Sequence, residues 1–144
     1  MKVLVLGHSG MLGSTVYDYL IGEVDSLTVI SERWPSTPFK NMIKEFDGDY
    51  IINCIGAIPQ RTDKFEINYE LPIWLDDNVT CRVIHQDTDM WEEKDDYTMS
   101  KVKAARHISH NGKRTKMLKT SIIGHDKNKV CLLDWFLSSE AEAT

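Results

Sequence analysis

Apolar and polar stretches alternate along the 144 residues in a way that predicts strands and helices in turn. The run KVLVL at residues 2–6 stops at Gly7, which is typical of a short strand buried on both faces. Residues 11–22 then place apolar side chains close to helical spacing, and Gly22 can end that helix. Residues 27–30 predict a second strand.

The rest of the chain continues this alternation. Thr37 followed by Pro38 predicts a capped helix start, and that helix reaches to about Phe46. The segment DYIINCIGAI is the strongest strand pattern, because it is rich in β-branched residues and stops at a turn with Gly and Pro. The remaining expected elements are a short helix or turn over 68–77, a strand over 81–86, a helix over 95–109, a strand over 115–123 and an amphipathic helix over 130–143.

Strands that alternate with helices, without repeats or low-complexity segments, favour a parallel sheet with helices on its faces. We therefore predict an α/β fold, a compact doubly wound parallel sheet of the Rossmann type. A chain of 144 residues can bury one core and is too short for two, so we expect a single dinucleotide-binding domain over residues 1–144.

Composition narrows the classes of partner. A formal charge of −5 argues against nucleic acid and anionic membrane surfaces, and the short basic cluster at 113–119 lacks interleaved aromatic residues. The apolar run from Val3 to Leu6 is too short for a signal peptide or a membrane span. We therefore expect a cytoplasmic protein that binds neither nucleic acid nor membranes.

Cysteine and histidine usage gives no metal site. Cys54, Cys81 and Cys131 lie far apart in or beside apolar stretches, which fits reduced, buried thiols. His107 and His110 are close enough to form a ligand pair, but solvent-facing residues at a helix end are the simpler interpretation. We predict no bound metal.

Three glycines lie at the predicted turn from the first strand to the first helix. Gly7, Gly10 and Gly13 allow a tight turn, the approach of a diphosphate and close packing of helix on strand. The amides of Met11 and Leu12 would open the helix, whose amino end favours an anion. At this position the spacing predicts a dinucleotide site, and the alternative is a merely tight turn.

Six segments, in the same order, resemble motifs of the extended short-chain dehydrogenases/reductases. They are KVLVLGHSGMLGSTVYDYL, DYIINCIGAI, INYELPIWL, HQDTDMW, YTMSK and LKTSIIG. In that family they correspond to the nucleotide-binding turn, the fourth strand, an Asn-and-Pro segment, a Ser-Thr-Asp strand end, a Tyr-x-x-x-Lys helix and the sixth strand. The resemblance is greatest to the dTDP-4-dehydrorhamnose reductase branch.

The resemblance gives catalytic roles to Tyr97, Lys101 and Thr88. Residues four apart share a helix face, so Tyr97 and Lys101 can point into one site, where an ammonium would lower the pKa of the phenol. The family lysine also holds the nicotinamide ribose, and Thr88 matches the hydroxyl that binds the substrate carbonyl. The alternatives are an amphipathic tyrosine at a helix start capped by Asp95 or Asp96, and an ordinary strand-end threonine.

The cofactor choice depends on the end of the second strand. Ser31 and Arg33 favour the phosphate of NADP(H), whereas Glu32 favours NAD(H), and we expect NADP(H). The resemblance implies that four further residues, in the next strand, lie beneath the cofactor. They are Asn53, Cys54, Ile55 and Gly56.

Departures from the family concern length. Members of the branch are longer, and this chain stops one predicted helix past the sixth strand, so we expect it to lack most of a carboxy-terminal substrate lobe. The stretch from Asn68 to Thr88 looks too short for a full helix plus strand. The apolar residues of the last predicted helix, between Leu132 and Leu137, can pack on the sheet or form a homodimer contact.

The resemblance implies NAD(P)H-dependent reduction of a keto group on a nucleotide-linked deoxysugar, with a small-molecule sugar nucleotide as partner. Two alternatives stay open. One is a non-catalytic nucleotide-binding sensor or interaction module. The other is a sugar-nucleotide epimerase or dehydratase, which would retain bound NAD.

Overall fold

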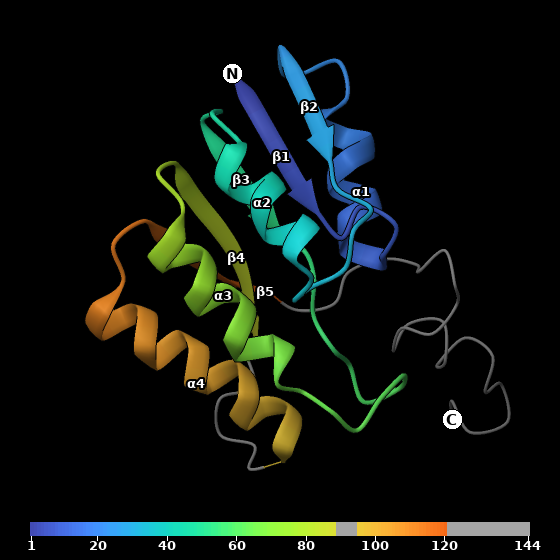
Figure 1. The fold of residues 1–144 in the computed structure, drawn as a ribbon. Helices are drawn as coiled ribbons and strands as arrows, with labels where there is room; N and C mark the ends of the chain where they lie inside the picture. The colour runs from blue at the N-terminus through green and yellow to red at the C-terminus, as the bar shows by residue number, and fades with distance from the viewer. Residues whose placement is uncertain (89–94, 121–144) are drawn as a thin grey trace, which may run out of the picture.

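The computed structural model describes residues 1–88 and 95–120, and within them five strands form one parallel sheet in the order β2-β1-β3-β4-β5 (Figure 1). Strand β1 pairs on one side with β2 and on the other with β3. The prediction of a doubly wound, Rossmann-like parallel sheet is confirmed. The strands are β1 (Lys2–Leu6), β2 (Ser26–Val29), β3 (Tyr50–Asn53), β4 (Arg82–Thr88) and β5 (Thr115–Thr120).

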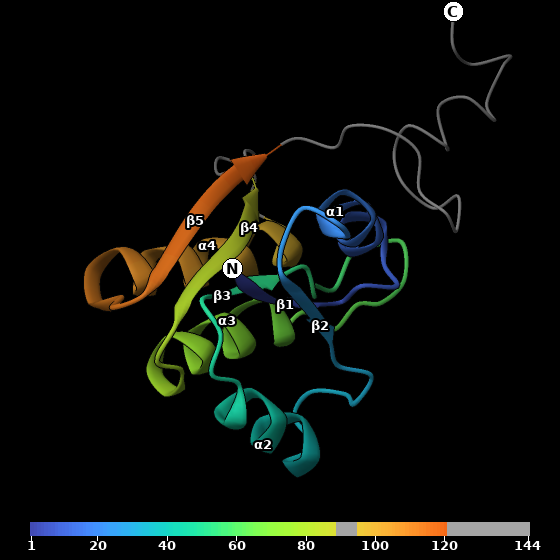
Figure 2. The same ribbon diagram turned by 90° about the horizontal axis from the view of Figure 1, so that it is seen from above.

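The described helices cover the two faces unequally. They are α1 (Met11–Leu20), α2 (Thr37–Glu45), α3 (Ile67–Asn78) and α4 (Asp96–Asn111). The chain moves from β1 to β2 in one direction along the sheet and then from β2 to β5 in the other. Because parallel crossovers are right-handed, α1 lies on one face, whereas α2, α3 and α4 lie on the opposite face (Figure 2).

The direction of the strands defines where a ligand can bind. All described strands are parallel, so their carboxyl ends share one edge, and each described helix begins there. The chain leaves β1 toward β2, and β3 lies on the other side of β1, so the order reverses between β1 and β3. Doubly wound sheets bind ligands at such a reversal, outside the carboxyl ends of the strands.

The core lies between helices α2 and α3 and the face of the sheet that they cover. Alternation along the strands points their apolar side chains toward the helices, and closer to the carboxyl edge the same face becomes polar. The apolar part comprises Leu4, Leu6, Ile51 and Val83 with Phe39, Ile43, Leu71 and Leu75. The polar part comprises the buried side chains of Asn53, His85 and Asp87.

A buried carboxylate fastens α3 to the start of β5. Asp76 is 2% exposed, and its oxygens accept hydrogen bonds of 2.8–3.0 Å from the amides of residues 113–115 and from the Thr115 hydroxyl. Burial raises the pKa of this carboxyl. The hydrogen bonds together lower the pKa by a larger amount, so the net pKa lies below the usual value. Asp76 therefore stabilises the fold as a carboxylate.

Two expectations about element ends are wrong. The cap of α2 is Ser36, whose Oγ accepts from the amide of Phe39 at 3.2 Å, so Thr37 is already the first helical residue. The strand predicted over 49–58 ends at Asn53. Beyond Asn53, hydrogen bonds to side-chain amides take the place of the hydrogen bonds between strands. Asn53 accepts from the backbone amide of Ile55, and Asn68 accepts from the backbone amide of Ala57 and donates to its carbonyl.

The expectation that residues 68–88 are too short for a full helix and strand is also wrong. The 12-residue helix α3 and the 7-residue strand β4 both fit there. Although Pro72 lies inside α3, Leu71 and Leu75 are fully buried against the sheet. Their burial outweighs the hydrogen bond that proline removes.

The last predicted helix, with Cys131 and the apolar residues from Leu132 to Leu137, lies outside the described residues. Among the helices that are described, none is long and apolar enough to cross a membrane.

Candidate functional site

The glycine-containing loop follows β1 and leads directly into α1. Gly7 has a φ of 80°, a left-handed conformation that favours glycine, and its carbonyl accepts from the amide of Gly10 at 3.1 Å. Gly10 is the cap of α1, with extended backbone and no capping side chain. The chain thus turns tightly from strand to helix at the carboxyl edge.

The loop and the helix approach each other so closely at Gly13 that no side chain fits. A Cβ on Gly13 would lie 1.8 Å from the carbonyl oxygen of Gly7. A Cβ on Gly10 would meet the same oxygen at 3.5 Å, which is an ordinary contact. Gly13 therefore serves the packing of α1, whereas Gly10 leaves the outer side of the loop open.

The start of α1 can receive an anion. The amides of Met11, Leu12 and Gly13 belong to the first turn, which has no intrahelical acceptors, and the ladder begins with Ser14 donating to Gly10 at 2.9 Å. The helix dipole adds partial positive charge at this point. Backbone amides without a competing side chain suit a diphosphate group.

The end of β2 lies next to this loop, because β2 pairs with β1. Ser31, Glu32 and Arg33 are all exposed, beyond the buried Ile30. An acidic and a basic side chain are therefore both available where a ribose with or without a phosphate would bind.

The end of β3 lies on the other side of the loop. A Cβ on Gly7 would touch the carbonyl carbon of Cys54 at 3.0 Å, so the two backbones are in close contact. Burial raises the pKa of the Cys54 thiol to about 12, which makes it an unreactive neutral group. Gly56 is exposed, and Ile55 is partly buried against the core. These residues form a floor of small or apolar groups beside the glycine loop.

A buried polar pair connects β3 with β4 beneath that floor. Asn53 donates from Nδ2 to Nδ1 of His85 at 3.0 Å, which assigns the proton of the imidazole to Nε2. Burial lowers the pKa of His85 to about 3, and the positive charge of Lys101 contributes to this. His85 is therefore neutral and acts as a fixed hydrogen-bonding group.

Tyr97 and Lys101 lie on the first turns of α4, which Asp95 caps by accepting from the amide of Thr98 at 2.7 Å. Lys101 is 5% exposed, and its Nζ lies 6.0 Å from the centre of the Tyr97 ring. The rings of Phe65 and Tyr97 pack edge to face, with ring centres 5.7 Å apart. The structure thus brings the predicted pair to one side of the helix at the carboxyl edge.

The predicted lowering of the Tyr97 pKa is wrong. Burial raises the pKa of this phenol above its usual value, and the carboxylates of Asp95 and Asp87 raise it further. Nζ of Lys101 donates to Oε1 of Gln86 at 2.7 Å. The phenol therefore stays protonated at neutral pH, the form that a proton donor needs.

Thr88 is 7% exposed and ends β4 beside this pair. The carboxylate of the preceding residue, Asp87, acts electrostatically on both Tyr97 and Lys101, so the strand end and the helix start lie close together. Because β1, β3 and β4 are neighbours, these groups share the carboxyl edge with the glycine loop.

The sequence interpretation missed a set of buried or partly buried polar residues around this edge. Asn68 connects the chain after β3 to α4, since its Nδ2 donates to Ala57 at 3.0 Å and to Ser100 at 3.1 Å. Gln86 accepts a hydrogen bond from Lys101, and Asp87 acts on Lys101 electrostatically. The signals in the sequence were the polar run HQD at the end of an otherwise apolar strand and the Asn-and-Pro segment INYELPIWL. The missed residues are Asn68, His85, Gln86, Asp87 and Ser100.

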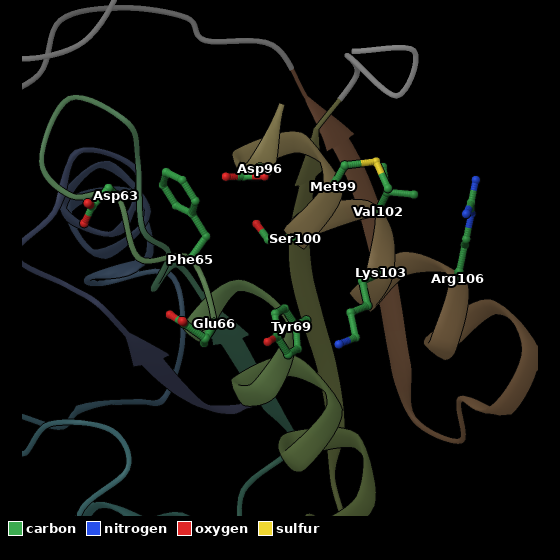
Figure 3. A pocket seen from close by; sticks show the side chains of 10 residues that line it. All are labelled: Asp63, Phe65, Glu66, Tyr69, Asp96, Met99, Ser100, Val102, Lys103 and Arg106. Atoms are coloured by element: carbon green, nitrogen blue, oxygen red, sulfur yellow. The ribbon is translucent and has the colours of Figure 1, made fainter. Parts of the chain in front are cut away.

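A hollow of about 530 Å³ lies between the starts of α3 and α4, away from the glycine loop (Figure 3). Acidic groups line one end and basic groups the other, and Nζ of Lys103 lies 3.9 Å from the centre of the Tyr69 ring. Ser100 lines the hollow and also donates to the carbonyl of Tyr97. The hollow therefore borders the first turns of α4.

Within residues 1–88 and 95–120, no group of three or more His, Cys, Asp or Glu side chains could hold a metal ion. Cys54 and Cys81, the cysteines of that part of the chain, are free thiols.

This geometry defines the class of the fold, a Rossmann-like doubly wound sheet with a glycine loop at its switch point. No protein-family model and no curated protein matches the chain. Solved structures do match it, among them the enzyme WbmH of Bordetella bronchiseptica in complex with NAD⁺, with a TM-score of 0.74 at 13% identity, over 99% of this chain and 63% of that one.

Two further solved structures are similar. One is a short-chain dehydrogenase/reductase superfamily protein of Agrobacterium tumefaciens with bound NAD, with a TM-score of 0.69 at 14% identity, over 87% of this chain and 50% of that one. The other is dTDP-glucose 4,6-dehydratase of Bacillus anthracis in complex with NAD, with a TM-score of 0.67 at 13% identity, over 100% of this chain and 62% of that one. At this identity the likeness shows the fold, and the chain spans half to under two thirds of these proteins' length.

Proposed function

We propose that this chain binds a nicotinamide dinucleotide at the glycine loop and belongs to the short-chain dehydrogenase/reductase superfamily. The observation that carries the proposal is the start of α1, where a tight glycine turn presents backbone amides without a competing side chain. The similar structures named above contain NAD, which supports a dinucleotide at the corresponding place.

We further propose that the reaction is reduction of a keto group on a nucleotide-linked deoxysugar, as in the dTDP-4-dehydrorhamnose reductases. A bound reduced nicotinamide supplies the hydride for the carbonyl carbon. Tyr97 donates its phenolic proton to the carbonyl oxygen, and the phenol carries that proton at neutral pH. Thr88 orients the carbonyl, and Lys101 holds the ribose.

Redox-neutral chemistry on the same class of substrate is the second candidate, because one similar structure is a dTDP-glucose dehydratase. An epimerase or dehydratase regenerates its NAD in each cycle and keeps it bound. Purified protein that carries tightly bound NAD would favour this candidate over the reductase.

The phosphate specificity is also a proposal. Arg33 and Ser31 support NADP(H) by offering a guanidinium and a hydroxyl to the 2′-phosphate, whereas Glu32 would repel it. Calorimetric titration with NADPH and NADH in parallel measures the preference. Failure of both to bind at millimolar concentration would contradict the dinucleotide site itself.

Tyr97→Phe tests the catalytic role. We expect turnover of dTDP-4-dehydrorhamnose with NADPH or NADH to fall by roughly 100-fold or more, because the proton donor is lost, while the affinity for the cofactor stays nearly unchanged. Tyr19→Phe is the matched control, since Tyr19 is 75% exposed on α1. Equal turnover in Tyr97→Phe and wild type would contradict the role of Tyr97, whereas cofactor binding without turnover in the wild type would favour a non-catalytic nucleotide-binding module.

A further inference from the structure

The ammonium group of Lys101 occupies a defined place inside the protein. The side chain is 5% exposed, and Nζ donates to Oε1 of Gln86 at 2.7 Å. A charged donor at this distance makes a strong hydrogen bond. The amide oxygen of Gln86 therefore determines where the ammonium lies.

The amide group of Gln86 is itself held in one orientation. Its Nε2 donates to the backbone carbonyl of Asp87 at 2.7 Å. Because the nitrogen is engaged there, the oxygen faces Lys101, and a flip of the amide would lose both hydrogen bonds. One hydrogen bond thus holds the Gln86 amide to its own strand, and the other makes its oxygen a fixed acceptor for Lys101.

The next residue supplies negative charge. Asp87 is 1% exposed, and its Oδ1 accepts from the amide of Thr88 at 2.8 Å, which fixes the carboxylate at the strand end. That carboxylate favours the charged form of Lys101 and the neutral form of Tyr97. Both effects match the protonation states that the proposed reduction uses.

We propose that Gln86 and Asp87 are positioning residues for Lys101, the amide by fixing the location of the ammonium and the carboxylate by retaining its positive charge. The placement is a property of the free protein. Only its consequence for cofactor binding rests on the proposed function.

The electrostatic surroundings explain why such a pair is needed. Burial lowers the pKa of Lys101 to about 8, and Asp87 opposes this shift. The neutral groups nearby are His85 on β4 and Tyr97 on α4 itself. From α3, the neutral amide of Asn68 donates to the hydroxyl of Ser100, the residue before Lys101. Among the described groups, Asp87 is thus the carboxylate that raises the pKa of Lys101 and so favours its charged form.

The test is a proton titration of Lys101 by NMR on full-length protein labelled with ¹³C at lysine Cε, without any ligand. The Lys101 signal is the one that Lys101→Arg removes. In Asp87→Asn we expect the midpoint to fall by about one pH unit or more, because an opposing charge is lost. Asp76→Asn is the matched control, since Asp76 is equally buried but serves the start of β5.

Gln86 is tested by a pair of substitutions of similar size. Gln86→Met removes the acceptor and should lower the Lys101 midpoint, whereas Gln86→Glu places a carboxylate against the ammonium and should raise it. Gln86 is only partly buried, so this pair decides the matter even where Asp87→Asn does not fold. Unchanged midpoints in Gln86→Met and Gln86→Glu would overturn the proposal, as would an Asp87→Asn midpoint that equals that of Asp76→Asn.

NADH affinity at pH 7 then connects the pair to the proposed function. We expect Gln86→Met to weaken NADH severalfold without changing the melting temperature by more than the control does. Shifted midpoints together with unchanged NADH affinity would leave the placement of Lys101 intact but remove its role in holding ribose. Absence of NADH binding to the wild type would contradict the proposed function alone.

Discussion

Substitution of the glycines at the start of α1 separates their two roles. Gly13 lies where a Cβ would come within 1.8 Å of the Gly7 carbonyl oxygen, and ordinary contact begins at 3.4 Å. In Gly13→Ala the helix start must therefore move by about 1.6 Å away from the loop, the difference between these two distances. The obstacle is backbone, which cannot rotate aside.

The cost follows from this displacement. Overpacking of a rigid site costs about 1–3 kcal/mol, and contact with backbone places Gly13→Ala at about 3 kcal/mol or more. For a chain of this length, that corresponds to a fall of roughly 6–12 °C in melting temperature. A hydrogen bond of about 2.9 Å from the displaced amides to a diphosphate would no longer form, so cofactor binding should be lost as well.

Gly10→Ala isolates the ligand from the fold. A Cβ there meets the Gly7 oxygen at an ordinary 3.5 Å, and the φ of −79° suits alanine. We expect stability within about 1 kcal/mol of the wild type. The methyl group would stand where the diphosphate approaches, so the affinity for NADH should fall by about tenfold or more.

The assays are thermal unfolding followed by circular dichroism, and calorimetric titration with NADH and NADPH. Gly22→Ala measures backbone strain without a clash, because the φ of 85° costs alanine about 1–2 kcal/mol while no atom lies within 4 Å of a Cβ there. A Gly13→Ala protein as stable as the wild type would refute the packing argument. Undiminished cofactor affinity in Gly10→Ala would refute the placement of the diphosphate.

Two predictions concern buried titratable groups. Asp76→Ala should lower the unfolding free energy by about 3 kcal/mol, because buried amides at the start of β5 lose a charged acceptor, and urea unfolding measures this. Since the folded pKa of Asp76 is lowered, its stabilisation is complete above about pH 4 and is lost as the pH falls through the folded value, so Asp76→Ala should lack this acid dependence. The pKa of His85 is lowered to about 3, so the unfolded chain binds a proton first, and stability should fall by up to about 1.4 kcal/mol per pH unit from about pH 6.5 downward. His85→Gln should flatten that slope, and an unaltered slope would show that other groups cause it.

Sequence periodicity was sufficient for the order of elements. The strand at residues 2–6 and the helix after it follow from local patterns of apolar residues and glycine, and the structure places them there. Local patterns were less reliable at ends. Ser36 and Thr37 are equally good caps by composition, and only the geometry of the turn assigns the hydrogen bond to Ser36.

Longer-range packing decided where the patterns were weak. Pro72 argues locally for a turn, yet α3 continues past it because leucines four residues apart are buried against the sheet. Similarly, side-chain amides from Asn53 and Asn68 end β3 early. The role of Asn68 cannot be predicted from neighbouring residues, since its partners lie 11 and 32 positions away.

The candidate site shows the same division. By itself, the sequence determined the glycine turn and the four-residue spacing of Tyr97 and Lys101, because both are local properties of the backbone. Only the tertiary structure decided the charges at that spacing, where burial and Asp87 keep the phenol protonated and Gln86 takes the hydrogen bond of the ammonium. The reason is physical: a pKa depends on desolvation and on charges across a fold, and neither exists until distant segments pack together.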